Sequence, residues 1–322
     1  MKKLLYFLLL TGFFSCDNGK NDIILPDSSG RTHNIMLIME NKDWRSEVGD
    51  SLRKYLAVDY NDLPQAEPLF SIRQVSPDLY NGIFLTLRNL LIIKKGSKTG
   101  IRIKRNVRAN PQMIAIIEGR DNEEIKQIIS KHIGELIDKF KASEIKNLQR
   151  LHRKSLRDNS DVEKELDISI EIPDFFNLVD HQKDFFWFRR DVKNGEQDIL
   201  LYQIPIKDSL DLQGRNVLKY RDSIGKHFIP GPADGTYMKT KMTFSPSQQI
   251  LQIDGMKALE SRGLWNMKKD FMAGPYINYT IFDTENKRMI VAEGFIYAPS
   301  IDKRDYIVQL EAILKTVKNK KN

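Results

Sequence analysis

The side chains best suited to metal binding or nucleophilic catalysis are few in this chain of 322 residues, which has five histidines and one cysteine. No histidine pair has the His-Glu-x-x-His spacing that brings two ring nitrogens to one zinc ion. A Gly-x-Ser-x-Gly turn, which exposes a serine nucleophile in many hydrolases, is also absent from the sequence. The sequence therefore predicts no metal site, no cofactor and no catalytic residue of a common type.

One acid–base pair could form near the middle of the chain, where His181 lies between Asp180 and Asp184. A histidine hydrogen-bonded to a carboxylate can act as a general base. Because no nucleophile or metal ligand accompanies these residues in the sequence, an exposed polar turn is the favoured interpretation.

The lone cysteine, Cys16, has a different chemistry because of the residues before it. Residues 1–3 carry two lysines, residues 4–14 are mostly apolar, and Ser15 is a small residue directly before the cysteine. This pattern is typical of a secretory signal that is too short to span a membrane. With cysteine at the cleavage point, it resembles a bacterial lipoprotein signal. We therefore expect residues 1–15 to be removed and Cys16 to carry acyl chains, including palmitate, that anchor the protein to a membrane.

The segment that follows, residues 16–31, is polar and rich in Asn, Gly, Ser and Asp, which is typical of a flexible tether. Anchor and tether together predict a protein of the bacterial cell envelope whose body lies outside the cytoplasm. The outer membrane is favoured over the inner membrane. The formal net charge of +8 is too small an excess to indicate nucleic acid as a partner.

A run of basic residues between positions 94 and 105 contains no acidic residue. Its Gly and Lys residues lack the spacing of a phosphate-binding loop, so we expect a hairpin. Such a hairpin could bind anionic partners such as lipid headgroups or glycans, although a solvated hairpin explains the charges as well. The candidate residues of this basic patch are Lys94, Lys95, Lys98, Arg102, Lys104 and Arg105.

A second candidate surface lies between positions 221 and 276, where aromatic and arginine residues alternate with Gly-Pro turns. Tyr, Trp and Arg are the residue types most enriched in recognition surfaces. A core position for Trp265, with Arg262 as its hydrogen-bonded neighbour, is the alternative. The candidate residues of this surface are Arg221, Tyr237, Arg262, Trp265 and Tyr276.

The elements that must position these residues fall into two halves, residues 32–165 and 166–322. Apolar runs and three-to-four spacings predict strands and helices in both. In the first half we expect strands at 34–40, 69–75, 87–93, 101–107 and 112–118, and helices at 43–56 and 121–157. In the second half we expect strands at 166–172, 185–189, 199–206, 237–244, 276–282 and 289–297, and helices at 213–227 and 306–317.

Short gaps between the expected strands predict an α+β fold with largely antiparallel sheets and helices packed on one face. The two halves also have a similar plan. Residues 114–119 read IAIIEG and residues 290–294 read IVAEG, so each half is expected to have a strand that ends in Glu-Gly before a closing helix. This similarity raises the hypothesis of an internal duplication.

Several longer segments resemble one known family. They are LPDSSGRTHNIMLIMENKDWRSEVGDSLRKYL, LPQAEPLFSIRQV, LRNLLII, ANPQMIAIIEG, FIPGPADGTYM, ESRGLW, MAGPY and EGFIYAPSIDKRDYIVQLEAIL. They look like the bacterial lipoprotein family called domain of unknown function 4837, and the likeness runs from about residue 25 to the end of the chain. The resemblance implies a cell-envelope location and a lipid-anchored cysteine. It implies no activity, substrate or catalytic residue.

These observations predict a non-enzymatic binding or assembly module. Its expected partners are a membrane, through the anchor, and a protein or glycan of the envelope. The alternative is an envelope hydrolase that acts on glycan or peptide through carboxylates, or a His–Asp site, that no motif reveals. Paired catalytic carboxylates are defined by their separation in space, which a sequence does not show.

Overall fold

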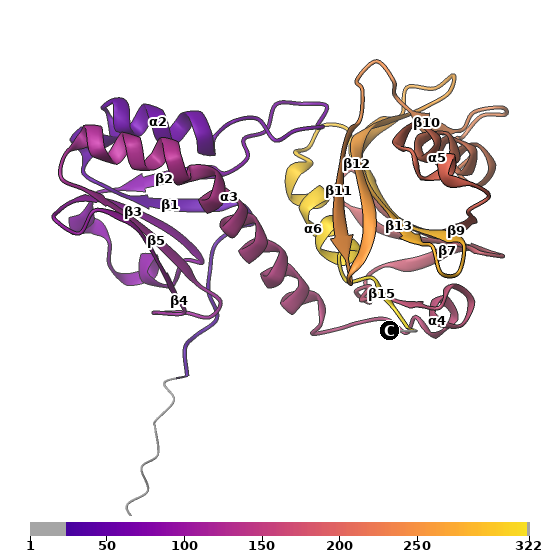
Figure 1. Ribbon diagram of the computed structural model, residues 1–322, viewed down its shortest axis with the longest axis horizontal. Helices are drawn as coiled ribbons and strands as arrows, with labels where there is room; N and C mark the ends of the chain where they lie inside the picture. The colour runs from indigo at the N-terminus through magenta and orange to yellow at the C-terminus, as the bar shows by residue number, and fades with distance from the viewer. Residues whose placement is uncertain (1–23, 321–322) are drawn as a thin grey trace, which may run out of the picture.

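The computed structural model describes residues 24–320. They form two α+β halves that lie side by side and are bridged by one long helix (Figure 1). The α+β class predicted from the sequence is confirmed. Within residues 24–320, no helix has the length and apolar character needed to cross a bilayer.

The first half has a five-stranded sheet in the order β2-β1-β3-β5-β4. The first four strands in this order are parallel, and only β4 runs antiparallel to its neighbour. Helices α1 and α2 follow β1, and two short 3₁₀ helices follow β2. The bounds are β1 Asn34–Ile38, α1 Asn41–Trp44, α2 Glu47–Leu56, β2 Ser71–Val75, β3 Asn89–Lys95, β4 Gly100–Arg105 and β5 Met113–Gly119.

Both faces of this sheet are covered. One face packs on α2 and on the start of α3, and the other packs on the segment 77–87 with its 3₁₀ helices Pro77–Leu79 and Gly82–Thr86. Strands buried on two faces are apolar along their whole length, which explains continuous runs such as residues 113–117. Largely antiparallel pairing holds for the molecule as a whole, and this sheet is the exception.

Helix α3, Asn122–His152, connects the halves. Asp121 caps it by accepting a hydrogen bond from the amide of Glu124 at 2.9 Å. Its 31 residues extend about 45 Å, so its first turns lie on the first sheet while its last turns reach the second half (Figure 1). Leu148, near its end, belongs to the hydrophobic core of the second half.

The second half has an eight-stranded antiparallel sheet in the order β10-β12-β13-β14-β9-β8-β7, with β11 paired to β12. Helix α6 packs on one face and α5 on the other, so the predicted single helical face is wrong for this half. The bounds are α4 Ser160–Leu166, β6 Ile168–Ser169, β7 Asn177–Gln182, β8 Phe185–Val192, β9 Gly195–Pro205, α5 Gly214–Phe228, β10 Met238–Thr240, β11 Ser247–Ile253, β12 Met256–Met267, β13 Ala273–Asp283, β14 Arg288–Tyr297, α6 Arg304–Leu314 and β15 Lys318–Asn319; a 3₁₀ helix spans Ser209–Leu212.

Two further expectations need correction. The strand expected at 166–172 is the end of α4 followed by the two-residue strand β6. The segment IVAEG does not end a strand, because β14 continues past Gly294 to Tyr297, whereas β5 does end at Gly119. A mainly parallel sheet in one half and an antiparallel sheet in the other also give the two halves different topologies.

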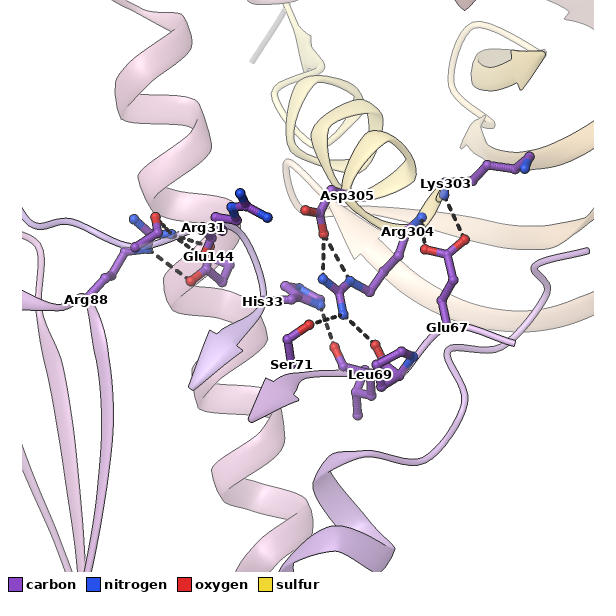
Figure 2. Close-up of polar contacts among 12 residues, drawn as sticks. Arg31, His33, Glu67, Leu69, Ser71, Arg88, Glu144, Lys303, Arg304 and Asp305 are labelled. Carbon is purple, nitrogen blue, oxygen red and sulfur yellow. Dashed lines mark hydrogen bonds and ion pairs between the residues drawn. The ribbon is translucent and has the colours of Figure 1, made fainter. Parts of the chain in front are cut away.

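The halves meet at a junction built around the start of α6 (Figure 2). The carboxylate of Glu67, from the first half, accepts hydrogen bonds from the backbone amides of Lys303 and Arg304 at 2.7 and 2.9 Å. It thus caps a helix of the other half, where unpaired amides and the helix dipole favour a negative charge. The side chain of Arg304 in turn donates a hydrogen bond to the carbonyl of Pro68, in the first half, at 2.6 Å.

A second buried contact joins the segment just before β1 to helix α3 (Figure 2). The guanidinium of Arg88 forms a two-point ion pair with Glu144, at 2.9 and 3.1 Å, and also donates to the carbonyls of Gly30 and Arg31. Both charged side chains are almost completely buried. The positions of the two halves are therefore set by specific polar contacts as well as by shared apolar core.

Candidate binding cleft

A cleft of about 780 Å³ lies between the two halves. One wall is formed by the loop after α2 and the exposed face of α3. The other wall is formed by β11, β12 and the end of α6. Because the walls come from different halves, the junction contacts described above determine the width of the cleft.

Arg262 of β12 lies at the floor of this cleft with only 14% of its side chain exposed. It donates to both carboxylate oxygens of Glu260, at 2.8 and 3.0 Å, in the fork geometry that arginine makes best. Its Nη2, shared with Glu260, also reaches a carboxylate oxygen of Glu311 on α6 at 2.8 Å, and its Nη1 donates to the hydroxyl of Tyr60 at 2.9 Å. One guanidinium therefore joins three segments of the chain.

The two carboxylates of the floor have further donors. Glu260 accepts from the hydroxyl of Tyr279 at 2.7 Å and from the amide of Gln249 at 2.6 Å. Glu311 accepts from the ammonium of Lys315 at 2.5 Å. These contacts leave the floor as a closed network of paired charges.

The network keeps both carboxyl groups ionised. Burial alone would raise their pKa values, but hydrogen bonds and charge from Arg262 outweigh it and lower the pKa of Glu260 below its usual value. The pKa of Glu311 is lowered to about 2 for the same reason, with Lys315 contributing as well. A glycosidase needs one carboxyl whose raised pKa keeps it protonated as an acid. The floor of the cleft lacks such a group, so its chemistry suits binding.

The walls offer polar groups that nothing else in the described part of the chain occupies. Lys141, Lys146 and Asp138 of α3 line the cleft and have no side-chain hydrogen bond or ion pair among residues 24–320. On the opposite wall, Gln249 of β11 lies beside Glu260, to which its amide nitrogen donates at 2.6 Å. Ammonium and carboxylate groups together match a ligand with both donors and acceptors, such as a glycan or an extended peptide.

The candidate surface between positions 221 and 276 is not one exposed surface. Trp265 and Tyr276 are 1% exposed and Arg221 is 4% exposed. They lie on the face of the second sheet that α5 covers, where Arg221 pairs with Glu293 at 2.7 Å and lies 3.8 Å from the ring centre of Tyr276. The prediction of an exposed surface is wrong for these three residues, and the alternative core position for Trp265 is the correct one.

The other two residues of that candidate surface remain accessible in part, but they are in different places. Arg262 is in the cleft floor. Tyr237 lies before β10, on the opposite side of the sheet, beside Lys226 and Lys268. Any binding role for either residue stays a prediction.

The hairpin expected for the basic patch does not form, because β5 lies between β3 and β4 and pairs with both. The fold also brings acids to half of the patch. Glu118 of β5 pairs with Lys94 at 3.1 Å and with Arg102, and Asp43 pairs with Lys95 at 3.1 Å. The remaining members of the patch have no carboxylate partner among the residues that the structure describes. They are Lys98, Lys104 and Arg105.

The acid–base pair around His181 does not form. Its ring contacts Glu165 at 2.8 Å instead of Asp180 or Asp184, and Asp184 sits in the turn between β7 and β8 with a positive φ of 62°. Asp180 and His181 lie on β7, so only Asp184 occupies the turn that was expected. Cys16 and the signal before it lie outside the described residues.

Most residues of the cleft could not be identified from the sequence alone. Glu311, Lys141 and Lys146 lie on helices among many similar residues, and only the fold brings them together. One signal was available at Glu260 and Arg262, because residues two apart on a strand share a face. It was missed because no strand was expected there.

Comparison with known families matches the two halves separately. The model described as domain of unknown function 4837 matches residues 155–316, just over half of the chain, and domain of unknown function 8532 matches residues 28–153. The resemblance noted in the sequence extends over both halves, whereas the match to its family covers the second. No curated protein matches the chain significantly.

Solved structures show two distant likenesses. The Ran-binding protein Mog1p of Saccharomyces cerevisiae is 10% identical, covers 48% of this chain and 90% of its own, and has a TM-score of 0.34. LpqN of Mycobacterium tuberculosis, described as involved in cell envelope biogenesis, is 15% identical, covers 47% of this chain and 83% of its own, and has a TM-score of 0.29. TM-scores this low support no inference about function. The family assignment rests on the family match alone, and it shows that the chain belongs to the family of domain of unknown function 4837.

Proposed function

We propose that this protein is a lipid-anchored, non-enzymatic binding module of the bacterial cell envelope, and that it holds part of a protein or glycan partner in the cleft between its halves. The anchor is Cys16, the tether is residues 16–31, and the outer membrane is the proposed site. No nucleic acid or cofactor takes part.

The observation that supports binding over hydrolysis is the state of the cleft floor. Glu260 and Glu311 are both held as carboxylates by Arg262, with Lys315 adding to Glu311. Neither can supply the proton that a leaving group needs at neutral pH. The wall residues Lys141 and Lys146, in contrast, are available to a ligand without breaking any existing ion pair.

Site-specific photo-crosslinking in cells tests the cleft. A photoreactive amino acid replaces Lys146 on one wall or Gln249 on the other, and Lys131, an exposed residue of α3 that does not line the cleft, serves as the control. We expect the same adduct from both cleft positions and none from the control. Adducts from all three positions, or from the control alone, would contradict the proposal.

An assay with envelope glycans and peptides tests the enzymatic alternative. We expect no turnover by the purified protein. Turnover that disappears in Glu260→Gln or Glu311→Gln would show instead that the cleft is an active site.

Metabolic labelling tests the anchor. We expect the wild-type chain to incorporate labelled palmitate and the Cys16→Ser variant to incorporate none, because the thiol is the proposed acceptor. Equal labelling of the two chains would rule out Cys16 as the site.

A further inference from the structure

The end of the second half that carries the hairpin between β12 and β13 combines two features that the cleft does not use. The first is Phe271, in the turn of that hairpin, whose side chain is fully exposed to solvent. Large aromatic side chains are usually buried at least in part, because each one removes a large apolar area from water. A fully exposed phenylalanine at the tip of a turn is therefore placed to contact something outside the molecule.

The second feature is a cluster of lysines around Tyr237. The ammonium groups of Lys268 and Lys226 lie 5.2 and 5.8 Å from the centre of the Tyr237 ring. The ammonium group of Lys268, together with the charges of Lys226 and Lys239, lowers the pKa of Tyr237. Lys269 follows in the same turn as Phe271.

None of these four lysines has a carboxylate partner among residues 24–320, in contrast to Lys94 and Lys95 of the basic patch. Two acids belong to the same loops. Asp270 uses its carboxylate to accept the backbone amide of Met272 at 3.1 Å, and Asp234 lies in the loop before Tyr237. The cluster keeps an excess of positive charge next to the exposed aromatic ring.

We propose that this end of the second half docks on the surface of an anionic membrane, with Phe271 inserted at the boundary between headgroups and acyl chains. Lys226, Lys239, Lys268 and Lys269 then contact the headgroup phosphates. A bilayer presents an anionic layer directly above an apolar one, which matches cations set around a single protruding ring. A protein partner would instead need a complementary groove for Phe271. The experiments below distinguish a protein partner from a membrane.

This inference goes beyond the proposed function, since it requires neither the cleft nor its ligand. The proposed anchor keeps the body within reach of a bilayer, and the docking surface would fix which side of the body faces it. Residues 17–322 contain every residue that the structure describes, so this chain, without signal or acyl groups, isolates the docking surface from the anchor.

Vesicle binding by this chain tests the proposal. The probes are vesicles of phosphatidylcholine alone and of phosphatidylcholine with about 30% phosphatidylglycerol, in about 0.1 M salt. We expect binding to the anionic vesicles only, weakened by added salt. Each lysine contributes about a fivefold gain in affinity, so Lys268→Glu with Lys269→Glu should weaken binding by at least about 25-fold. Phe271→Ala should weaken it about tenfold.

Matched controls are available in the first half. Lys42→Glu with Arg45→Glu reverses two exposed charges outside the basic patch that also lack carboxylate partners among residues 24–320, and Ile83→Ala removes an 80% exposed apolar side chain. Both variants should bind as the unaltered chain does. Wild-type binding that does not depend on lipid charge, or an equal loss in the Lys42 and Arg45 variant, would overturn the proposal.

A fluorescent variant separates a loss of contact from a loss of folding. Phe271→Trp should fold normally, because the position is fully exposed, and its emission should shift to shorter wavelength with anionic vesicles alone. An unshifted emission, or crosslinking from position 271 to a protein and not to lipid in cells, would also overturn membrane docking.

Discussion

At the scale of single residues, Arg262 determines the chemistry of the cleft. It is the cation shared by Glu260 and Glu311, and it also binds the hydroxyl of Tyr60 from the other half. A buried charge network is costly to disrupt from one side, because removing the shared cation leaves two acids without their main partner. The same residue therefore supports the floor, the junction and the ionised state of the acids.

Replacing Arg262 should destabilise the protein strongly. We expect Arg262→Leu to lower the free energy of unfolding by about 3–5 kcal/mol, because the carboxylate of Glu260 then remains buried without a cation. Denaturant unfolding measures this loss. Lys139→Leu is the control, since its pair with Glu135 is exposed and should matter by less than about 1 kcal/mol. Similar losses for the two variants would argue against a central role of Arg262.

Two buried histidines should make stability depend on pH. Burial lowers the pKa of His33 and of His152 to about 4, from an ordinary value of 6.5, with neighbouring arginines adding to the effect. The unfolded chain then takes up protons first as the pH falls. The stabilisation is fully present above pH 6.5 and declines between pH 6.5 and pH 4, by up to about 1.4 kcal/mol per pH unit for each histidine.

Unfolding measured at pH 6.5, 5.5 and 5 checks this dependence. His33→Leu and His152→Leu should each make the decline of stability with falling pH less steep in this range, by up to about 1.4 kcal/mol per pH unit, whatever they do to stability at pH 7. An unchanged slope in both variants would mean that neither histidine is responsible.

At the scale of elements, local patterns identified the helices better than the strands. The three-to-four spacing of Ile125, Ile129 and Ile133 predicted α3, whose inner face is apolar. The hairpin of β11 and β12 was missed because its buried positions include Glu260 and Ser261, residue types that are usually exposed. Such polar residues are tolerated inside only because the fold supplies their partners, and a sequence does not show those partners.

Strand direction in the first sheet was also beyond local patterns. Parallel pairing joins β1 to β3 across fifty intervening residues, and nothing in a short window of sequence specifies such a pairing. One global signal was present, since continuous apolar runs are typical of strands buried on both faces. In this sheet the continuous apolar runs are typical of parallel strands, whereas the short gaps between expected strands are typical of antiparallel hairpins. The sheet is mainly parallel, in agreement with the apolar runs.

The capping of α6 by Glu67 gives a prediction at this scale. Glu67→Gln should lower the free energy of unfolding by about 1–2 kcal/mol, because the amides of Lys303 and Arg304 lose a charged acceptor at a helix start. Glu47→Gln, which alters an exposed pair with Lys126, is the control and should have an effect below about 0.5 kcal/mol. Hydrogen exchange should also speed up at residues 303 and 304 in the first variant alone, and unaltered exchange there would contradict the cap.

At the scale of the whole molecule, the two halves share core and cleft. Tyr60 and Leu148 of the first half belong to the apolar core of the second, and Gln149 of α3 donates to the carbonyl of Ala312 on α6 at 3.0 Å. The fold class and the division into halves could be predicted from composition and spacing. The cleft could not, because it exists only where residues far apart in the sequence face each other.

The central claim is that one ligand contacts both walls of this cleft, and charge reversal on one wall with crosslinking from the other tests it most directly. Lys141→Glu with Lys146→Glu alters only α3, and a photoreactive residue at position 249 reports from β11. The account predicts that the adduct formed at position 249 falls at least about fivefold in the double variant. An adduct of undiminished yield would contradict a ligand held between the two halves.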